Sequence, residues 1–187
     1  MASDTTMSDI KEKYIEQYRI YHQDQTKYPG NSFRNGDRHI TDLIKETGAQ
    51  TLLDYGCGKA TQYTQQKQHL KWGVGMPALY DPAVPEYAEL PEQMFDGIYS
   101  TDVMEHIPED VIPEVFEWIF NHAKKFVFLG ISTQPAVAIL PNGENAHCTV
   151  KPVEWWVEQI KQHTPVYTHL KCYGNYRGYV VLNNGCE

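Results

Sequence analysis

The stretch from Gln50 to Gln62 reads Gln-Thr-Leu-Leu-Asp-Tyr-Gly-Cys-Gly-Lys-Ala-Thr-Gln. It opens with Thr51-Leu52-Leu53, a short apolar run of the kind that forms a buried parallel strand. Gly56 and Gly58 follow, and glycine reaches positive φ without strain and lets a ligand lie against the backbone. A helix that starts after such a turn offers free N–H groups. The stretch therefore predicts a strand, a tight turn that can hold a ligand, and a helix.

Two common nucleotide-binding patterns do not fit this turn. The NAD-type fingerprint requires G-x-G-x-x-G, but Thr61 stands at the last position. The phosphate-loop pattern requires G-K-[ST], and Lys59 is followed by Ala60. A plain strand-to-helix turn without a ligand stays open as an interpretation. In a ligand-binding turn, Asp54 at the end of the strand can accept hydrogen bonds from a cationic or N–H-bearing ligand.

The turn resembles motif I of the class I methyltransferases that use S-adenosylmethionine (SAM), in which an acidic residue precedes G-x-G-x-G at the end of the first strand. Asp54, Gly56 and Gly58 match this motif, and Ala60 stands where the third glycine would be. Alanine is small enough to preserve close packing there. The resemblance implies that Asp54, Gly56 and Gly58 hold the amino-acid part of SAM and that Ala60 also belongs to the cofactor site.

Asp81 is the candidate ribose ligand. It follows a second strand that we expect within residues 72–80, and an acidic side chain at this place accepts both ribose hydroxyls in nucleotide-binding α/β folds. The other interpretation is that Asp81 starts an Asp-Pro turn. The short, Pro-rich segment between Asp81 and Phe95 predicts that the next crossover is reduced to a loop, with residues 87–90 as an edge strand.

A second match lies in residues 95–108, which read FDGIYSTDVMEHIP. This segment resembles the fourth strand and following loop of the same superfamily, with the form F-D-x-h-x-s-x-D-V-h-E-H-h. Asp102, Glu105 and His106 share one face if the loop is helical. Two carboxylates and an imidazole can bind a divalent cation, or the imidazole can take a proton from a hydroxyl. A purely structural role in orienting the loop is the third interpretation.

The loop over residues 134–152 should overhang the carboxyl ends of the strands and contribute substrate specificity. It contains His147, and the terminal ribose O-methyltransferases of small RNAs are similar: there, two carboxylates and two histidines hold a divalent metal. The resemblance implies that Asp102, Glu105, His106 and His147 bind Mg²⁺ or Mn²⁺, with Asp in place of the usual Glu at the first position. Asp102 is also expected to contact the cofactor. In the alternative, His106 and His147 are catalytic bases without a metal.

The N-terminal part predicts two helices. Asp37 is expected to cap the second of them, which ends at Gly48. We assign residues 1–48 to a helical cap and residues 49–187 to a SAM-binding core, within a single domain. The first helix covers residues 8–21, and we expect its aromatic face to pack into the core. Its apolar and aromatic side chains recur at helical spacing: Ile10, Tyr14, Tyr18 and Tyr21.

The C-terminal part completes an α/β pattern. Residues 112–123 carry an apolar stripe of helical spacing, and residues 125–132 form an apolar run typical of a buried strand. Another helix is expected over residues 153–162. Residues 167–172 and 176–182 predict an antiparallel hairpin. A methyltransferase sheet ends in such a hairpin, whereas a dehydrogenase fold continues with parallel crossovers.

Composition limits the partners. The 187 residues carry 16 basic and 24 acidic side chains, a net charge of −8, which disfavours nonspecific binding of nucleic acid. Four cysteines form no C-x-x-C pair, and neither a signal peptide nor a long apolar run is present. We expect a reduced, cytoplasmic protein without a membrane span. Its oligomeric state stays open.

These observations predict an α/β fold with a Rossmann-like, mostly parallel sheet of the class I methyltransferase type and a C-terminal antiparallel hairpin. The resemblance implies a SAM-dependent methyltransferase that methylates an oxygen of a small polar or sugar-like acceptor. One alternative is a metal-dependent terminal ribose O-methyltransferase that acts on RNA. Another is a SAM-binding or interaction module without catalytic activity.

Overall fold

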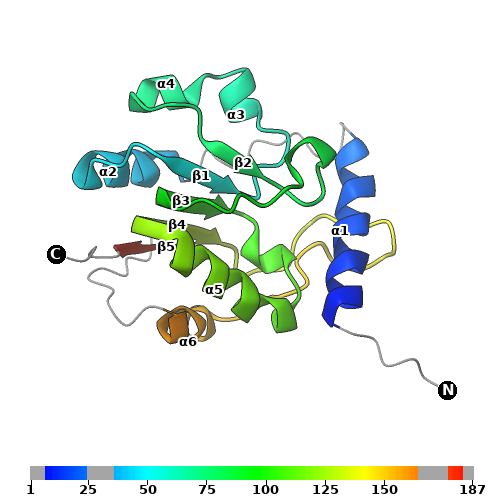
Figure 1. Cartoon of the computed structure of the whole chain (residues 1–187). Coiled ribbons are helices and arrows are strands. Elements are labelled where there is room, and N and C mark those ends of the chain that lie inside the picture. Colours follow the sequence, from blue (N-terminus) through cyan, green and yellow to red (C-terminus); the bar gives the residue numbers. More distant parts are fainter. Residues whose placement is uncertain (1–6, 25–35, 164–176, 183–187) are drawn as a thin grey trace.

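A computed structural model describes residues 7–24, 36–163 and 177–182. In these residues, five strands form one sheet in the order β2-β1-β3-β4-β5. The first four are parallel, and β5 pairs antiparallel with β4 (Figure 1). The strands are β1 (Leu52–Tyr55), β2 (Ala78–Tyr80), β3 (Phe95–Thr101), β4 (Ala123–Ile131) and β5 (Arg177–Leu182).

Helices cover both faces of the sheet, and one further helix lies across the ends of its strands. In Figure 1, α3 and α4 lie above the sheet and α5 and α6 lie below it. Helix α2, at the left of the view, packs in the same core cluster as α3 and α4, whereas α5 and α6 pack in the other cluster. Helix α1 stands across the carboxyl ends of the parallel strands. The α-helices are α1 (Met7–Gln23), α2 (Asp37–Thr47), α3 (Thr61–Thr64), α4 (Gln68–Trp72), α5 (Ile112–His122) and α6 (Val153–His163). The described residues also form the short 3₁₀ helices η2 (Pro85–Tyr87), η3 (Met104–His106) and η4 (Glu109–Val111).

The central strands are apolar on both sides because helices cover both sides. On β4, Phe126 and Phe128 pack with α2, α3 and α4, whereas Val127 and Leu129 pack with α5 and α6. All four side chains are buried. Burying a side chain of this size contributes roughly 1.5–3 kcal/mol, so this strand anchors both halves of the core.

Helix α2 belongs to the sheet core. Its Ile40, Leu43 and Ile44 are buried against the same cluster as Phe128. As predicted, the helix ends at Gly48, which has a φ of 61° and donates its N–H to the Ile44 carbonyl.

The prediction that Asp37 caps α2 is wrong, because Gly36 occupies the N-cap and Asp37 is the first helical residue. Asp37 Oδ1 instead accepts a hydrogen bond of 2.6 Å from Gln68 Nε2, which links α2 to α4. The side chain is therefore used between two helices.

The crossover from β2 to β3 is short, as predicted. Residues 81–94 contain only the 3₁₀ helix η2, without an α-helix or a strand. The expected edge strand over residues 87–90 is wrong, because the segment folds back on itself. The Asp81 N–H donates to the Tyr87 carbonyl at 2.9 Å, and the Val84 N–H donates to the Asp81 carbonyl at 3.0 Å.

Other boundaries follow the sequence with smaller corrections. The predicted helix over residues 153–162 is α6, and the strand predicted over 176–182 is β5. Its hairpin partner, residues 167–172, lies outside the described residues. Of the strand expected within residues 72–80, only Ala78–Tyr80 is extended, because Trp72 ends α4. In the described part of the chain, no helix has both the length and the apolar content that a bilayer crossing needs.

Candidate active site

The turn after β1 depends on glycine for its backbone conformation and its packing. Gly56 has a φ of 86°, in the left-handed region that favours glycine. Its N–H donates to the Tyr80 carbonyl at 2.7 Å, which ties the turn to the end of β2. A Cβ on Gly56 would lie 2.3 Å from Val103 Cγ2, so a side chain here would push away the loop after β3. Gly58 also has a positive φ, of 55°.

Ala60 lies at the start of α3 with a φ of 51°. Its side chain is fully buried, which fits the close packing expected at the third position of the motif. A left-handed conformation costs a residue other than glycine roughly 1–2 kcal/mol. The third position therefore favours glycine for its backbone conformation as well as for its size.

Asp54 lies beneath the turn. Its Oδ2 accepts hydrogen bonds from Gln62 Nε2 at 2.9 Å and from Tyr63 Oη at 2.6 Å, and the Tyr63 hydroxyl also contacts that of Tyr99. Burial raises the pKa of Asp54 to about 6, although the bonds from Tyr63 and Gln62 act in the opposite direction. The carboxylate thus holds the turn to α3, and it is not among the groups that line the cavity described below.

Asp81 reaches the cavity from the end of β2. Its Oδ2 accepts the Gly58 N–H and its Oδ1 accepts the Ala83 N–H, both at 2.9 Å. Burial raises the pKa of this carboxyl, and the two N–H groups partly offset the effect. The bond to Ala83 shapes the Asp-Pro turn, and the bond to Gly58 joins that turn to the glycine turn. Both interpretations of Asp81 are therefore compatible with its position.

In the loop after β3, Asp102 lies outside the helical turn that contains Glu105 and His106. Asp102 has a left-handed φ of 55°, and its N–H donates to the Gly130 carbonyl at 2.8 Å. Only Met104–His106 form a helical turn, η3. The condition under which Asp102, Glu105 and His106 would share a helical face is therefore not met, because the helical turn begins after Asp102.

Glu105 is a buried acid in this loop. Its exposed fraction is 0%, and its Oε1 accepts the Ser132 N–H at 2.8 Å. Its Oε2 has no hydrogen-bond partner among the described residues. Burial, together with the nearby Asp102 charge, raises the pKa of Glu105 to about 8. A buried carboxylate oxygen without a partner is a strong candidate for a ligand contact.

His106 and His147 make the same kind of hydrogen bond, from Nδ1 to a backbone carbonyl. His106 Nδ1 lies 2.8 Å from the Ala146 carbonyl, and His147 Nδ1 lies 2.5 Å from the Gln134 carbonyl. Because a carbonyl only accepts, each Nδ1 must carry the hydrogen, which leaves the lone pair on Nε2. Burial lowers the pKa of His106 to about 4, with a further contribution from His147, and burial also lowers the pKa of His147.

Three of the four expected metal ligands come together. One ligand atom from each of Glu105, His106 and His147 lies within 4.8 Å of the others, and the two imidazole rings meet edge to face with centroids 4.7 Å apart. In the part of the chain that the structure describes, Asp102 is not a member of this group. Metal-ligating histidines usually donate the N–H of their second nitrogen to a carbonyl or carboxylate, as both rings do here.

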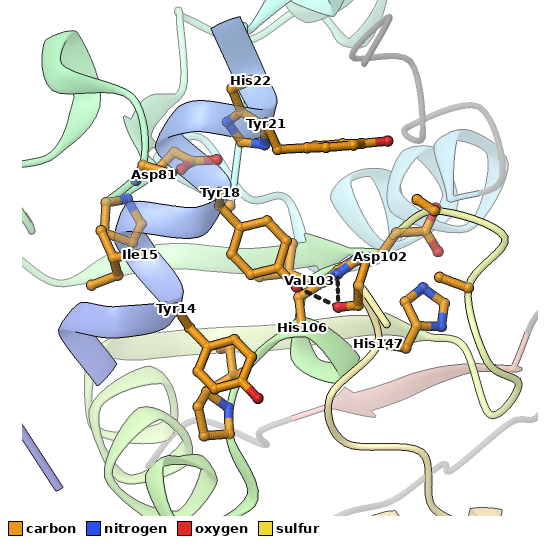
Figure 2. A pocket seen from close by; sticks show the side chains of 18 of the residues that line it. Tyr14, Ile15, Tyr18, Tyr21, His22, Asp81, Asp102, Val103, His106 and His147 are labelled. Carbon is orange, nitrogen blue, oxygen red and sulfur yellow. Dashed lines mark hydrogen bonds between the residues drawn. The ribbon is translucent and has the colours of Figure 1, made fainter. Parts of the chain in front are cut away.

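A cavity of about 520 Å³ lies at the carboxyl ends of the strands and is lined by both histidines, but not by Glu105. This volume is in the range of small-molecule sites. Figure 2 shows Asp81, Asp102, His106 and His147 around this cavity, with side chains of α1 on its near side. Of the predicted site residues, those that line it are Gly56, Asp81, Asp102, His106 and His147.

Sequence reasoning missed the contribution of α1. Tyr14, Ile15, Tyr18 and Tyr21 line the cavity, whereas we expected the aromatic face of this helix to pack into the core. Their helical spacing was the signal, but spacing does not distinguish an aromatic face in a core from one over a cavity. The Tyr18 hydroxyl oxygen also lies 2.9 Å from His106 Nδ1.

Comparisons with known proteins support the fold. No protein-family model and no curated protein matches the chain. Solved structures do match, including an O-methyltransferase family protein from Burkholderia thailandensis, with 14% identity, a TM-score of 0.64, and coverage of 92% of this chain and 64% of that one.

Two further structures are similar over most of both chains. A 1,6-didemethyltoxoflavin-N1-methyltransferase from the same organism, with S-adenosylhomocysteine bound, has 14% identity, a TM-score of 0.61 and coverage of 92% and 88%. DhpI, in complex with SAH, has 11% identity, a TM-score of 0.60 and coverage of 97% and 100%. These likenesses show a class I methyltransferase fold.

Proposed function

We propose that this protein is a SAM-dependent methyltransferase that methylates an oxygen of a small polar or sugar-like acceptor. The observation that carries the proposal is a single cavity lined by Gly56 and Asp81 on one side and by His106 and His147 on the other. In open α/β sheets, ligands bind at this end of the strands. SAM, when bound, supplies a methyl group activated by its sulfonium.

The residues at the strand ends fit the cofactor. Gly56 lines the cavity, and its missing side chain leaves room for Val103 of the neighbouring turn. Asp81 is a buried carboxylate at the cavity wall. A carboxylate has acceptor capacity beyond the two N–H groups it already binds, so Asp81 can also accept hydrogen bonds from ribose hydroxyls. Asp54 would act indirectly, by fixing the turn.

The histidines fit a metal better than a role as free bases. A pKa of about 4 makes His106 a weak base at neutral pH, but a neutral imidazole is the form that binds metals. We therefore propose that Glu105, His106 and His147 hold a divalent cation, which when bound polarises the acceptor hydroxyl. Two imidazoles favour Mn²⁺ over Mg²⁺. Asp102 would serve the cofactor rather than the metal.

The cavity favours a small acceptor over RNA. Among the described residues that line it, Lys11 is the only lysine or arginine, and its Nζ is 2.9 Å from a carboxylate oxygen of Glu114. A nucleic-acid strand needs cations that contact its phosphates. The net charge of −8 acts in the same direction.

We also propose that the enzyme works in a reducing compartment, the cytoplasm. Cys57 and Cys148 are free thiols. Non-reducing electrophoresis of the protein from cell fractions that were alkylated at lysis tests this. A disulfide-linked or exported form would contradict it.

Calorimetric titration of the metal-stripped protein with S-adenosylhomocysteine tests the cofactor site. We expect binding in the micromolar range, weakened at least about tenfold in Asp81→Ala, which corresponds to roughly 1.4 kcal/mol. Release of S-adenosylhomocysteine from SAM with a panel of polyols, sugars and a short RNA then identifies the acceptor class. Absence of binding would remove the enzyme assignment, and binding without turnover on any acceptor would favour a SAM-binding module.

A further inference from the structure

The contact between Tyr18 and His106 joins two segments that are 88 residues apart. Tyr18 lies on α1, and its ring meets that of His106 edge to face, with centroids 5.3 Å apart and an interplanar angle of 86°. Figure 2 shows Tyr18 pointing from α1 toward His106. The contact therefore connects the wall of the cavity to one of its reactive side chains.

The hydrogen bonds at this contact allow one arrangement of protons. The Tyr18 hydroxyl donates to the Ala146 carbonyl, which uses its single hydrogen. Its oxygen is 2.9 Å from His106 Nδ1, so Nδ1–H must be the donor in that pair. The same Nδ1–H lies 2.8 Å from the Ala146 carbonyl. Tyr18 thus accepts from the imidazole and also holds the carbonyl that the imidazole uses.

We propose that Tyr18 is a positioning residue of the proposed methyltransferase: it holds His106 in the tautomer with hydrogen on Nδ1 and the lone pair on Nε2. This inference rests on the proposed function, because the lone pair on Nε2 matters only if it binds a metal or accepts a proton. Tyr18 acts through His106 and does not itself touch the reacting atoms.

The hydrogen bonds of His106 depend on the position of α1. Lys11 and Lys13 tie the helix to Glu114 and Glu144 through ion pairs of 2.9 and 2.7 Å, but both pairs are exposed. Such pairs add little to stability. The contact of Tyr18 with Ala146 and His106 is the partly buried one. His106 therefore has its full set of partners only when α1 is seated across the strand ends.

Nitrogen NMR of the metal-free protein, with ¹⁵N-labelled histidine at about pH 7, tests the inference. His106 is assigned from the spectrum of His106→Gln. In the wild type we expect the Nδ1–H tautomer and a hydrogen that exchanges slowly with solvent. In Tyr18→Phe, which keeps the ring, the Nε2–H fraction should rise about fivefold, the change expected for one lost hydrogen bond. Tyr14→Phe, on the same helix and also at the cavity, is the matched control, and its His106 should keep the wild-type tautomer.

Two results would overturn the inference. The first is an NMR spectrum of the wild type that shows the His106 hydrogen on Nε2; this result requires no variant. The other is a Tyr18→Phe protein with a native amide spectrum and an unchanged tautomer. Titration of the same samples with S-adenosylhomocysteine separates this inference from the proposed function. An unchanged tautomer with intact binding rejects the role of Tyr18 alone, whereas a wild type that binds no S-adenosylhomocysteine rejects the cofactor assignment.

Discussion

Gly56 and Val103 are in such close contact that a methyl group on the Gly56 Cα would lie 2.3 Å from Val103 Cγ2. The two residues belong to the turns that follow β1 and β3, which are neighbouring parallel strands. The absence of a side chain at Gly56 therefore sets how closely the two turns approach each other at the candidate cofactor site.

Gly56→Ala should weaken binding of S-adenosylhomocysteine by at least about tenfold, or roughly 1.4 kcal/mol. The new Cβ must displace Val103, and the backbone φ of 86° at position 56 is unfavourable for alanine. Calorimetric titration measures the effect. Val103→Ala in the same chain should restore part of the affinity. Gly75→Ala, where a Cβ meets nothing within 4 Å, is the control and should bind normally.

Asp81→Asn should reduce cofactor affinity by at least about tenfold, because the amide retains one acceptor oxygen for two N–H donors. Asp96→Asn is a matched control, since Asp96 also accepts two backbone N–H groups, from Gln50 and Thr51, before β1. Both variants should lower the melting temperature. If Asp96→Asn weakens binding as much as Asp81→Asn, the effect is on stability and not on the site.

Asp54 should make the protein less stable as the pH rises. Its pKa is about 6 in the folded state, above its ordinary value of 3.8, so the folded state holds the proton more tightly. The stabilisation is complete below pH 3.8 and is lost as the pH rises through about 6. A difference of about two pH units corresponds to roughly 3 kcal/mol.

Urea unfolding of the wild type and Asp54→Asn over this range measures the effect. Between about pH 4 and about pH 7, the free energy of unfolding of the wild type should fall by roughly 3 kcal/mol relative to the variant. The comparison cancels the contributions of other titrating groups. Parallel curves for the two proteins would contradict the prediction.

Gly97→Ala should destabilise the fold by roughly 1–3 kcal/mol, the usual cost of overpacking. A Cβ on this residue of β3 would lie 2.2 Å from the Phe126 ring on β4. Chemical unfolding measures the change, and Phe126→Leu should relieve part of it. Gly130→Ala is the control on the neighbouring strand, because its Cβ would meet other atoms at ordinary distances of 3.6 Å or more. Equal effects at both glycines would contradict this account.

Titration of the chelator-treated protein with Mn²⁺ should show one site, and Glu105→Gln or His147→Gln should weaken it by more than about tenfold. The Gln side chain at 105 can still accept the Ser132 N–H, so the fold should persist. His122→Gln is the control, because His122 bonds to the Trp118 carbonyl on α5 instead of lining the cavity. Unchanged Mn²⁺ affinity in both Glu105→Gln and His147→Gln would contradict the proposed metal site.

The elements with strong local patterns were predicted well. The apolar run before the glycine turn is β1, the stripe over residues 112–123 is α5, and the short crossover before β3 is present. Each of these depends on periodicity or on turn residues that act over a few positions. Predictions about individual side chains were less successful. Asp37 does not cap α2. The contact expected between Asp54 and the amino-acid part of SAM stays a prediction, and Asp54 is not among the residues that line the cavity.

Residue order was thus enough to establish the succession of strands and helices and the chemical groups at the strand ends. Long-range packing determined which of those groups meet. It brings His147 to Glu105 and His106, leaves Asp102 outside that group, and places side chains of α1 along the cavity, with Tyr18 on His106. The physical reason is that a hydrogen bond between distant segments depends on how helices and loops pack around the whole sheet, and no local pattern encodes that arrangement.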